Sequence, residues 1–469
     1  MISRKVRYCR IPGWAIRGLL CTGLLLWAVA VQADPAAFDL AGPSLEVNVT
    51  RAGKTLPIAD VASLQSGDQL WIHPDFPESQ SVHYLLIVAF LRGTTNPPPE
   101  DWFTRVETWS KKVHSEGLVV TVPSTAQQVL VFLAPETGGD FSTLRSAVRG
   151  RPGTFVRASQ DLNEASLERS RLDKYLDEVK QTSENEPKVL QQRSEALART
   201  LNIKVDQGCF YKPAEQQAPC LMQNTDQLVL DDGHTQSMVA ALTTGPSSDL
   251  IGAVSATPLA AGGSFSPYVG AIVDMARLMS TLHTAEYQYI PALSLPRQNH
   301  LNLRLNSPPS FRNPKSVLVI GLPAVEAPQL PPLRAVSAAE VFCLQKTPLV
   351  LPVQGAPLVF STAIAHDFVL RVPTVTGQTI DLPATADAAR GGFTVDARAV
   401  PPGMPTLQVK GTLRGFWGFG TYEGPSFNLR TAQAGHWMVS AEDRSALIAD
   451  RDDTLHLKSE YAVCVDQVT

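Results

Sequence analysis

Short apolar segments separated by proline- and glycine-containing turns recur in two parts of this chain, and they constrain its fold more than any other feature. In the first part, Leu45, Val47 and Val49 alternate with polar residues, which is typical of a strand with one buried face. Further strand-like segments lie at 69–73, 84–91, 118–122 and 129–133, and the apolar run 84–91 suits a strand buried on both faces. Strands this short and this closely spaced predict a β-sandwich.

The second part, residues 336–469, shows the same pattern. Its predicted strands are 349–353, 358–361, 368–372, 379–382, 393–397, 407–413, 427–430, 436–440, 454–457 and 461–465. Strands at intervals of about 8–12 residues are typical of an immunoglobulin-like sandwich or a related barrel. The chain also holds 36 prolines in 469 residues, which suits edge strands and turns because proline fixes φ and lacks a backbone donor.

The region between these parts carries helical patterns. In residues 140–204, Asp161 and Glu164 have the spacing of a capping box, and apolar residues then recur at helical intervals up to Pro187. A second helix is predicted over 188–201, which gives a helical hairpin. Lys174 and Glu178 are placed to form a favourable surface ion pair on the first helix.

Residues 205–335 predict a mixed central region. Ser266 is a good N-cap, and Pro267 suits the first helical position, so a helix is predicted over 267–285. This helix is apolar on two sides, which predicts a position between two layers. Short strands are predicted before residue 291, at 301–305 and at 316–321, and the proline-rich stretch 323–332 is interpreted as a linker.

These patterns predict a mainly β, multidomain protein with α segments. Two β-sandwich, immunoglobulin-like regions flank a helical hairpin and a mixed α/β region. The predicted divisions are a signal peptide at 1–33, an N-terminal β-sandwich domain at 34–139, the hairpin at 140–204, the central region at 205–335 and a C-terminal β-sandwich domain at 336–469.

The first 33 residues have the order of a secretory signal. Five basic residues precede an apolar run from Gly18 to Val31, and Ala33 then offers a cleavage site. The run of 14 residues is shorter than the roughly 20 that a membrane span needs, and no later run approaches that length. We therefore expect export to the periplasm, cell envelope or extracellular space, with the segment either cleaved or retained as an anchor.

Removal of this segment leaves four cysteines, which can pair in three ways. We expect disulfides Cys209–Cys220 and Cys343–Cys464, because the first pair brackets a short loop and the second brackets the C-terminal β region. Neither pair has the CxxC spacing of a redox site, and no nearby histidine supplies a zinc site. The sequence thus predicts no metal and no cofactor.

The formal net charge changes from −4 for the whole chain to −9 once residues 1–33 are removed. No basic cluster remains, which argues against nucleic acid as a partner. The stretches 231–234 and 450–453 contain aspartates that could contact calcium, although solvated turns have the same composition.

The sharpest local pattern is the stretch 415–424, in which glycines alternate with aromatic residues. Phe416, Trp417, Phe419 and Tyr422, together with Trp437, are the candidate ligand-binding residues, because aromatic faces suit carbohydrate surfaces. The alternatives are a sandwich core filled by these rings and a protein contact.

No motif of nucleophilic, metal-dependent or nucleotide-dependent catalysis occurs in the chain. Asp274, Arg277, His283 and Glu286 lie on or after the central helix, where an ordinary ion pair is the simpler interpretation. We expect a binding or structural role, with polysaccharide or an envelope protein as partner. The alternatives are an exported polysaccharide hydrolase and a subunit of a larger envelope assembly.

Overall fold

The computed structural model describes residues 38–76, 83–135, 141–223, 225–230, 266–284, 286–297, 299–374, 377–396, 398, 400, 408–431, 437–446, 454–459 and 464. It is mainly β, with 38% strand against 32% helix. The predicted signal segment lies outside the described residues, and Phe38–Thr469 forms one compact unit.

A ten-stranded sheet contains the strands that precede residue 322. They are β1 (Leu40–Arg51), β2 (Lys54–Pro57), β3 (Gln69–Asp75), β4 (Tyr84–Leu91), β5 (Phe103–Glu107), β6 (Leu118–Thr121), β7 (Gln128–Pro135), β8 (Tyr287–Arg297), β9 (His300–Leu305) and β10 (Lys315–Gly321). The order is β5-β4-β7-β10-β8-β9-β1-β3-β6, with β2 paired to β1. Among the described strand pairs of this sheet, β8 and β10 alone are parallel. Strands from the predicted N-terminal and central regions therefore share one sheet. The domain boundaries predicted from the sequence are not tested by this pairing.

The two faces of this sheet contribute to different cores. Every residue of β4 is buried, in agreement with the predicted strand buried on both faces. Leu85 and Ile87 belong to the core that includes the helices. Leu86 and Val88 belong to a second core, which also contains side chains of β1, β3 and β9. The sheet therefore bends so that its two halves enclose apolar side chains between them.

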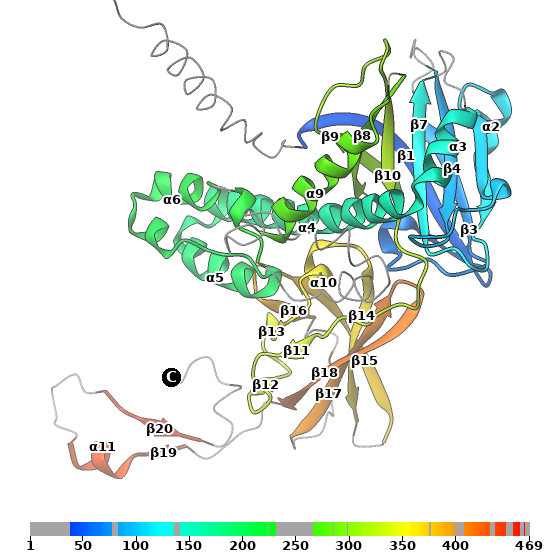
Figure 1. Cartoon of the computed structure of the whole chain (residues 1–469). Coiled ribbons are helices and arrows are strands. Elements are labelled where there is room, and N and C mark those ends of the chain that lie inside the picture. Colours follow the sequence, from blue (N-terminus) through cyan, green and yellow to red (C-terminus); the bar gives the residue numbers. More distant parts are fainter. Residues whose placement is uncertain are drawn as a thin grey trace, which may run out of the picture. The chain divides into compact units, whose positions relative to one another are not determined.

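Helices α4 and α9 pack on the face of the first sheet that carries Leu85 and Ile87. The described helices are α2 (Lys111–Glu116), α3 (Phe141–Gly150), α4 (Pro152–Asn185), α5 (Leu190–Leu201), α6 (Ala214–Leu221), α9 (Pro267–Thr281), α10 (Leu358–Ser361) and α11 (Ala441–Ala446). In Figure 1, α4 and α9 lie against one another, and both contact β8.

The predicted start of α4 is wrong. The helix begins at Pro152, where a missing N–H costs nothing, so Asp161 is a buried residue inside the helix and not its N-cap. The predicted start of α9 is confirmed, since Ser266 Oγ accepts from the Val269 N–H at 3.3 Å. This helix is buried on two sides, as predicted, and ends at Thr281, earlier than the predicted residue 285.

A second, eight-stranded sheet is formed by strands that lie between Arg334 and Arg430. Its strands are β11 (Arg334–Ala335), β12 (Val341–Cys343), β13 (Leu349–Gln354), β14 (Ala365–Pro373), β15 (Thr379–Asp387), β16 (Gly392–Val395), β17 (Val409–Trp417) and β18 (Gly420–Arg430). The order is β11-β13-β16-β15-β14-β17-β18-β12.

The strand predicted at 358–361 is wrong, because this segment is the one-turn helix α10. Pro357 has helical φ and ψ of −61° and −31°, which directs the following residues into a helical turn. The short apolar run Leu358–Phe360 does not by itself distinguish a strand from a helical turn, and Val359 and Phe360 are buried in the helix. Helix α10 contacts α4, α5, β14 and β15, so it joins the helical hairpin to the second sheet.

Both expected disulfides are present. Cys209, in the 3-10 helix η4 (Gln207–Tyr211), bonds to Cys220 of α6, and Cys343 of β12 bonds to Cys464. Near the C-terminus, β19 (Met438–Val439) and β20 (Leu457–Lys458) pair in a separate ribbon. Among the described residues, no helix is long and apolar enough to span a membrane.

Candidate functional site

An open groove lies between the helical hairpin and the second sheet. Its volume is about 520 Å³. One wall is formed by α4, α5 and Glu186, which follows α4, and the other by β15, β16 and the turn that connects them. The lining residues are Lys174, Glu178, Glu186, Arg193, Thr385, Ala386, Asp387, Ala389, Arg390 and Thr394.

The helical wall carries two ion pairs. Lys174 Nζ lies 2.8 Å from Glu178 Oε1, which confirms the predicted surface pair on α4. Arg193 Nη2 lies 3.4 Å from Glu186 Oε2 across the turn between α4 and α5. The chain reverses direction at this turn because Pro187 lacks the N–H that would continue the α-helix.

The sheet wall carries a third ion pair, at the tight turn between β15 and β16. Asp387 Oδ1 accepts the backbone N–H of Arg390 at 2.9 Å, and Asp387 Oδ2 lies 3.3 Å from Arg390 Nε. Gly391 then adopts a φ of +80°, a conformation that glycine reaches without strain. The aspartate therefore holds the turn and the arginine side chain together.

The two walls are joined at the base of the turn. Thr200 Oγ1 of α5 donates to the Ala388 carbonyl at 3.0 Å, and Arg199 Nη2 donates to the Gly391 carbonyl at 3.4 Å. The Thr200 side chain is fully buried, so its hydrogen bond is shielded from water. These contacts fix the β15–β16 turn on the helical hairpin.

Charge in the groove is balanced, with three cationic and three anionic side chains. Each carboxylate lies within 4.0 Å of a basic group. Thr394 Oγ1 is buried and has no hydrogen-bond partner in the described structure. The groove thus presents paired charges, whereas the unsatisfied Thr394 hydroxyl is enclosed by protein atoms.

The candidate aromatic residues do not form one surface. Trp417 and Tyr422 are buried in the core, and the Tyr422 hydroxyl donates to the Pro331 carbonyl at 3.1 Å. Phe416 and Phe419 are half-buried, each beneath a cation of the first sheet. Trp437, which is 36% exposed, belongs to the segment of the separate ribbon. Their ligand-binding role stays a prediction.

The tip of the β17–β18 hairpin instead contacts the first sheet. His366 stacks on Phe416 with ring centroids 5.5 Å apart, and Lys54 Nζ lies 4.7 Å from the centroid of the same ring. His366 Nε2 donates to the Gly418 carbonyl at 3.1 Å, while its Nδ1 lies 2.9 Å from Asp367 Oδ2. These rings and charges hold two sheets together.

Arg51 completes this junction. Its guanidinium lies 4.4 Å from the Phe419 ring centroid and pairs with Asp68 through two hydrogen bonds of 2.7 and 2.8 Å. Asp60 lies nearby, and desolvation raises the pKa of its half-buried carboxyl. His366 opposes this increase by attraction, and the Asp367 carboxylate adds to it.

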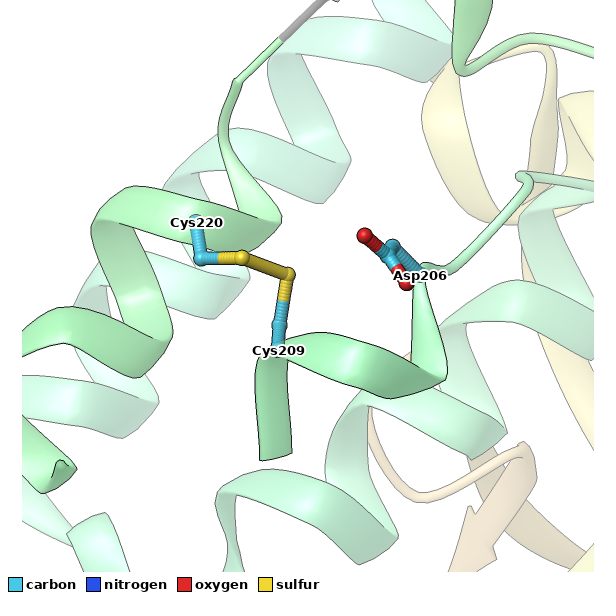
Figure 2. A group of neighbouring side chains, drawn as sticks. All are labelled: Asp206, Cys209 and Cys220. Carbon is cyan, nitrogen blue, oxygen red and sulfur yellow. A yellow bond between two sulfur atoms is a disulfide. The ribbon is translucent and has the colours of Figure 1, made fainter. Parts of the chain in front are cut away.

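One cluster has the composition of a metal site but not its chemistry. Asp206, Cys209 and Cys220 lie within 4.8 Å of one another by their ligand atoms. Figure 2 shows that the two sulfurs form a disulfide, so neither is available as a thiolate. Asp206 Oδ1 accepts the Gly208 N–H at 2.9 Å and acts as a cap for η4. The two aspartate-containing stretches considered for calcium lie outside the described residues.

The charged residues of α9 take part in an ion-pair network with α4. Asp274 lies 4.0 Å from Arg277, at the predicted intrahelical spacing, and 3.1 Å from Arg157 of α4. Arg157 also pairs with Asp161 at 3.2 Å. Burial raises the pKa of Asp161 to about 7, against the lowering effect of Arg157 and with a smaller contribution from Asp274.

The groove residues were not singled out from the sequence, apart from Lys174 and Glu178 as a surface pair. The turn Asp387–Gly391 is the one further local signal, because aspartate and glycine favour turns. Comparison of the chain with protein-family models, with curated proteins and with solved structures finds no match.

Proposed function

We propose that this protein is an exported cell-envelope or secreted protein that binds a ligand in the groove between the helical hairpin and the second sheet. The proposal retains the predicted signal peptide and the immunoglobulin-like character of the two β regions. The two disulfides and the lack of a membrane-spanning helix among the described residues are compatible with export.

The observation that carries the binding role is the groove itself. Its volume of about 520 Å³ lies within the range of about 300–1,000 Å³ that is typical of ligand sites. Both walls are held on rigid elements, and the Thr200–Ala388 hydrogen bond joins them. A preformed site of this kind binds without a large cost of ordering its walls.

The lining of the groove gives glycoside hydrolysis no particular support. It contains no aromatic side chain to hold a sugar ring, and Glu178, Glu186 and Asp387 each form an ion pair within a wall.

A role as a subunit of an envelope assembly is the second candidate. The ribbon segment exposes Met438 at 60%, Leu455 at 44% and Trp437 at 36% of their surfaces. Paired strands with exposed apolar side chains are typical of a surface that contacts another protein.

Capture of ligands from a cell-envelope extract tests the binding role. The mature, disulfide-bonded chain is immobilised as wild type, as the groove variant Arg193→Glu/Arg390→Glu and as the control Arg398→Glu. Arg398 is a suitable control because it is 84% exposed and lies outside the groove. We expect the wild type and the control to retain the same component and the groove variant to lose it. Equal retention by all three chains would contradict the proposal.

A further inference from the structure

We infer that the groove recognises a polypeptide segment that carries both acidic and basic side chains. This inference rests on the proposed binding function of the groove and names its ligand class. Three features of the groove carry it: the distribution of charge on the two walls, the arginine N–H groups that pair with no other described residue, and the chemical character of the lining.

Each wall of the groove is neutral by itself. The helical wall presents Lys174 and Arg193 with Glu178 and Glu186, and the sheet wall presents Arg390 with Asp387. A ligand with charges of one sign would meet attraction and repulsion of similar size on both walls. A ligand that alternates in sign can pair with the cations and the anions at once.

The wall pairs can be exchanged for pairs with a ligand. The side chains of Arg193 and Glu178 are 21% exposed, those of Asp387 and Arg390 are 32% and 36% exposed, and Glu186 is 60% exposed. Ion pairs with this much contact with water contribute little stability, so replacing one partner by a ligand group costs little.

The arginines have donors for further acceptors. Arg193 uses Nη2 in its pair with Glu186, and Arg390 uses Nε in its pair with Asp387, while each guanidinium has five N–H groups. Peptide carbonyls and carboxylates are suitable acceptors for the remaining N–H groups.

The lining favours a polypeptide over a neutral sugar chain. All ten lining residues are charged side chains, threonines or alanines, and the lining contains no aromatic ring. Aromatic faces are the usual contact for the apolar surfaces of sugars. Six charged side chains around a volume of about 520 Å³ instead favour a ligand with charges of its own.

Isothermal titration of the mature, disulfide-bonded chain tests this inference with defined probes. The probes are four synthetic octapeptides, which are alternating Lys/Glu, all-Lys, all-Glu and Gly/Ser, together with the neutral sugar maltohexaose. We expect the alternating peptide to bind at least ten-fold more tightly than each of the other probes. We also expect its affinity to fall when the salt concentration is raised, since these pairs are partly exposed.

Two matched pairs of variants locate the binding. Arg390→Gln and Asp387→Asn alter the ion pair on the sheet wall, whereas Arg398→Gln and Asp396→Asn alter an ion pair of the same composition outside the groove. We expect the groove variants to lower affinity for the alternating peptide at least five-fold and the controls to leave it unchanged. Thermal unfolding of all four variants checks that each is folded.

The outcomes separate this inference from the proposed function. If maltohexaose, or a peptide with one sign of charge, bound more tightly than the alternating peptide, the inference would be overturned. The groove would still be upheld as a binding site if Arg390→Gln weakened the binding of that probe. Absence of binding by every probe would also overturn the inference. The envelope capture experiment would then judge the proposed function by itself.

Discussion

Asp161 offers the most direct test of how burial controls charge in this fold. Its carboxyl group is 5% exposed inside α4, where Arg157 Nε lies 3.2 and 3.3 Å from its two oxygens. Burial raises the pKa of Asp161 to about 7 despite the attraction of Arg157, and the Asp274 carboxylate adds to the increase. In the unfolded chain the same carboxyl titrates near 3.8.

The sign of the effect on stability follows from these two values. Between pH 3.8 and about 7, the folded state binds a proton on Asp161 that the unfolded state has released. The stabilising contribution is therefore fully present below pH 3.8 and is lost as the pH rises to about 7. The two pKa values differ by about three pH units, each worth about 1.4 kcal/mol, so the loss is about 4 kcal/mol in total.

Replacement of Asp161 by asparagine removes this titration while keeping the size of the side chain. Urea unfolding, followed by circular dichroism, is measured between pH 4 and pH 8 for the mature wild type and for Asp161→Asn. The free energy of unfolding of the variant, relative to wild type, is expected to increase by about 4 kcal/mol over this range. Asp177→Asn is the control, because Asp177 lies on the exposed side of the same helix.

A difference between Asp161→Asn and wild type that stays constant from pH 4 to pH 8 would refute the reasoning. So would an equal increase in Asp177→Asn, because the effect would then belong to the charge of the helix and not to burial. A direct carbon-13 NMR titration of the Asp161 carboxyl gives an independent reading of the pKa, expected near 7.

Three further changes have defined outcomes. Cys343→Ser opens a loop of 121 residues and should lower the free energy of unfolding by about 4–5 kcal/mol in urea, whereas dithiothreitol, which also reduces Cys209–Cys220, should lower it further in wild type. Gly418→Ala should cost more than Gly377→Ala in thermal unfolding, because both have positive φ but only Gly418 has neighbours within 4 Å of an added Cβ. Arg171→Met should cost about 3–5 kcal/mol in urea unfolding, since Glu168, 2.6 Å away, would keep a buried charge without this partner.

The strands were largely predictable because their burial follows local patterns. Leu45, Val47 and Val49 alternate in sequence, and all three are fully buried in β1. The start of α9 was predictable for a similar reason, since Ser266 and Pro267 satisfy the helix terminus with local groups. Helix α10 was not, because the run of three apolar residues Leu358–Phe360 suits a strand or a helical turn.

The pairing of strands depends on contacts that a local pattern does not encode. β10 lies between β7 and β8 in the first sheet, although more than 150 residues of chain separate β7 from β8. The aromatic stretch 415–424 shows the same limit. Its composition suits a ligand surface or a core. In the structure, Lys54 lies over the Phe416 ring and Arg51 over the Phe419 ring, and these contacts come from a distant part of the chain.

The groove shows why the proposed binding surface leaves no motif in the sequence. Its walls come from residues about 200 positions apart, and each wall by itself is a neutral, solvated set of ion pairs. The surface arises where Thr200 and Ala388 join the helical hairpin to the β15–β16 turn. Ligand binding and the contact between the two walls are two coupled equilibria, and such coupling is reciprocal. A ligand that contacts both walls must therefore stabilise the contact between them by the same free energy that this contact adds to binding. In the proposed binding function, hydrogen bonds at the base of the groove therefore contribute to affinity without touching the ligand.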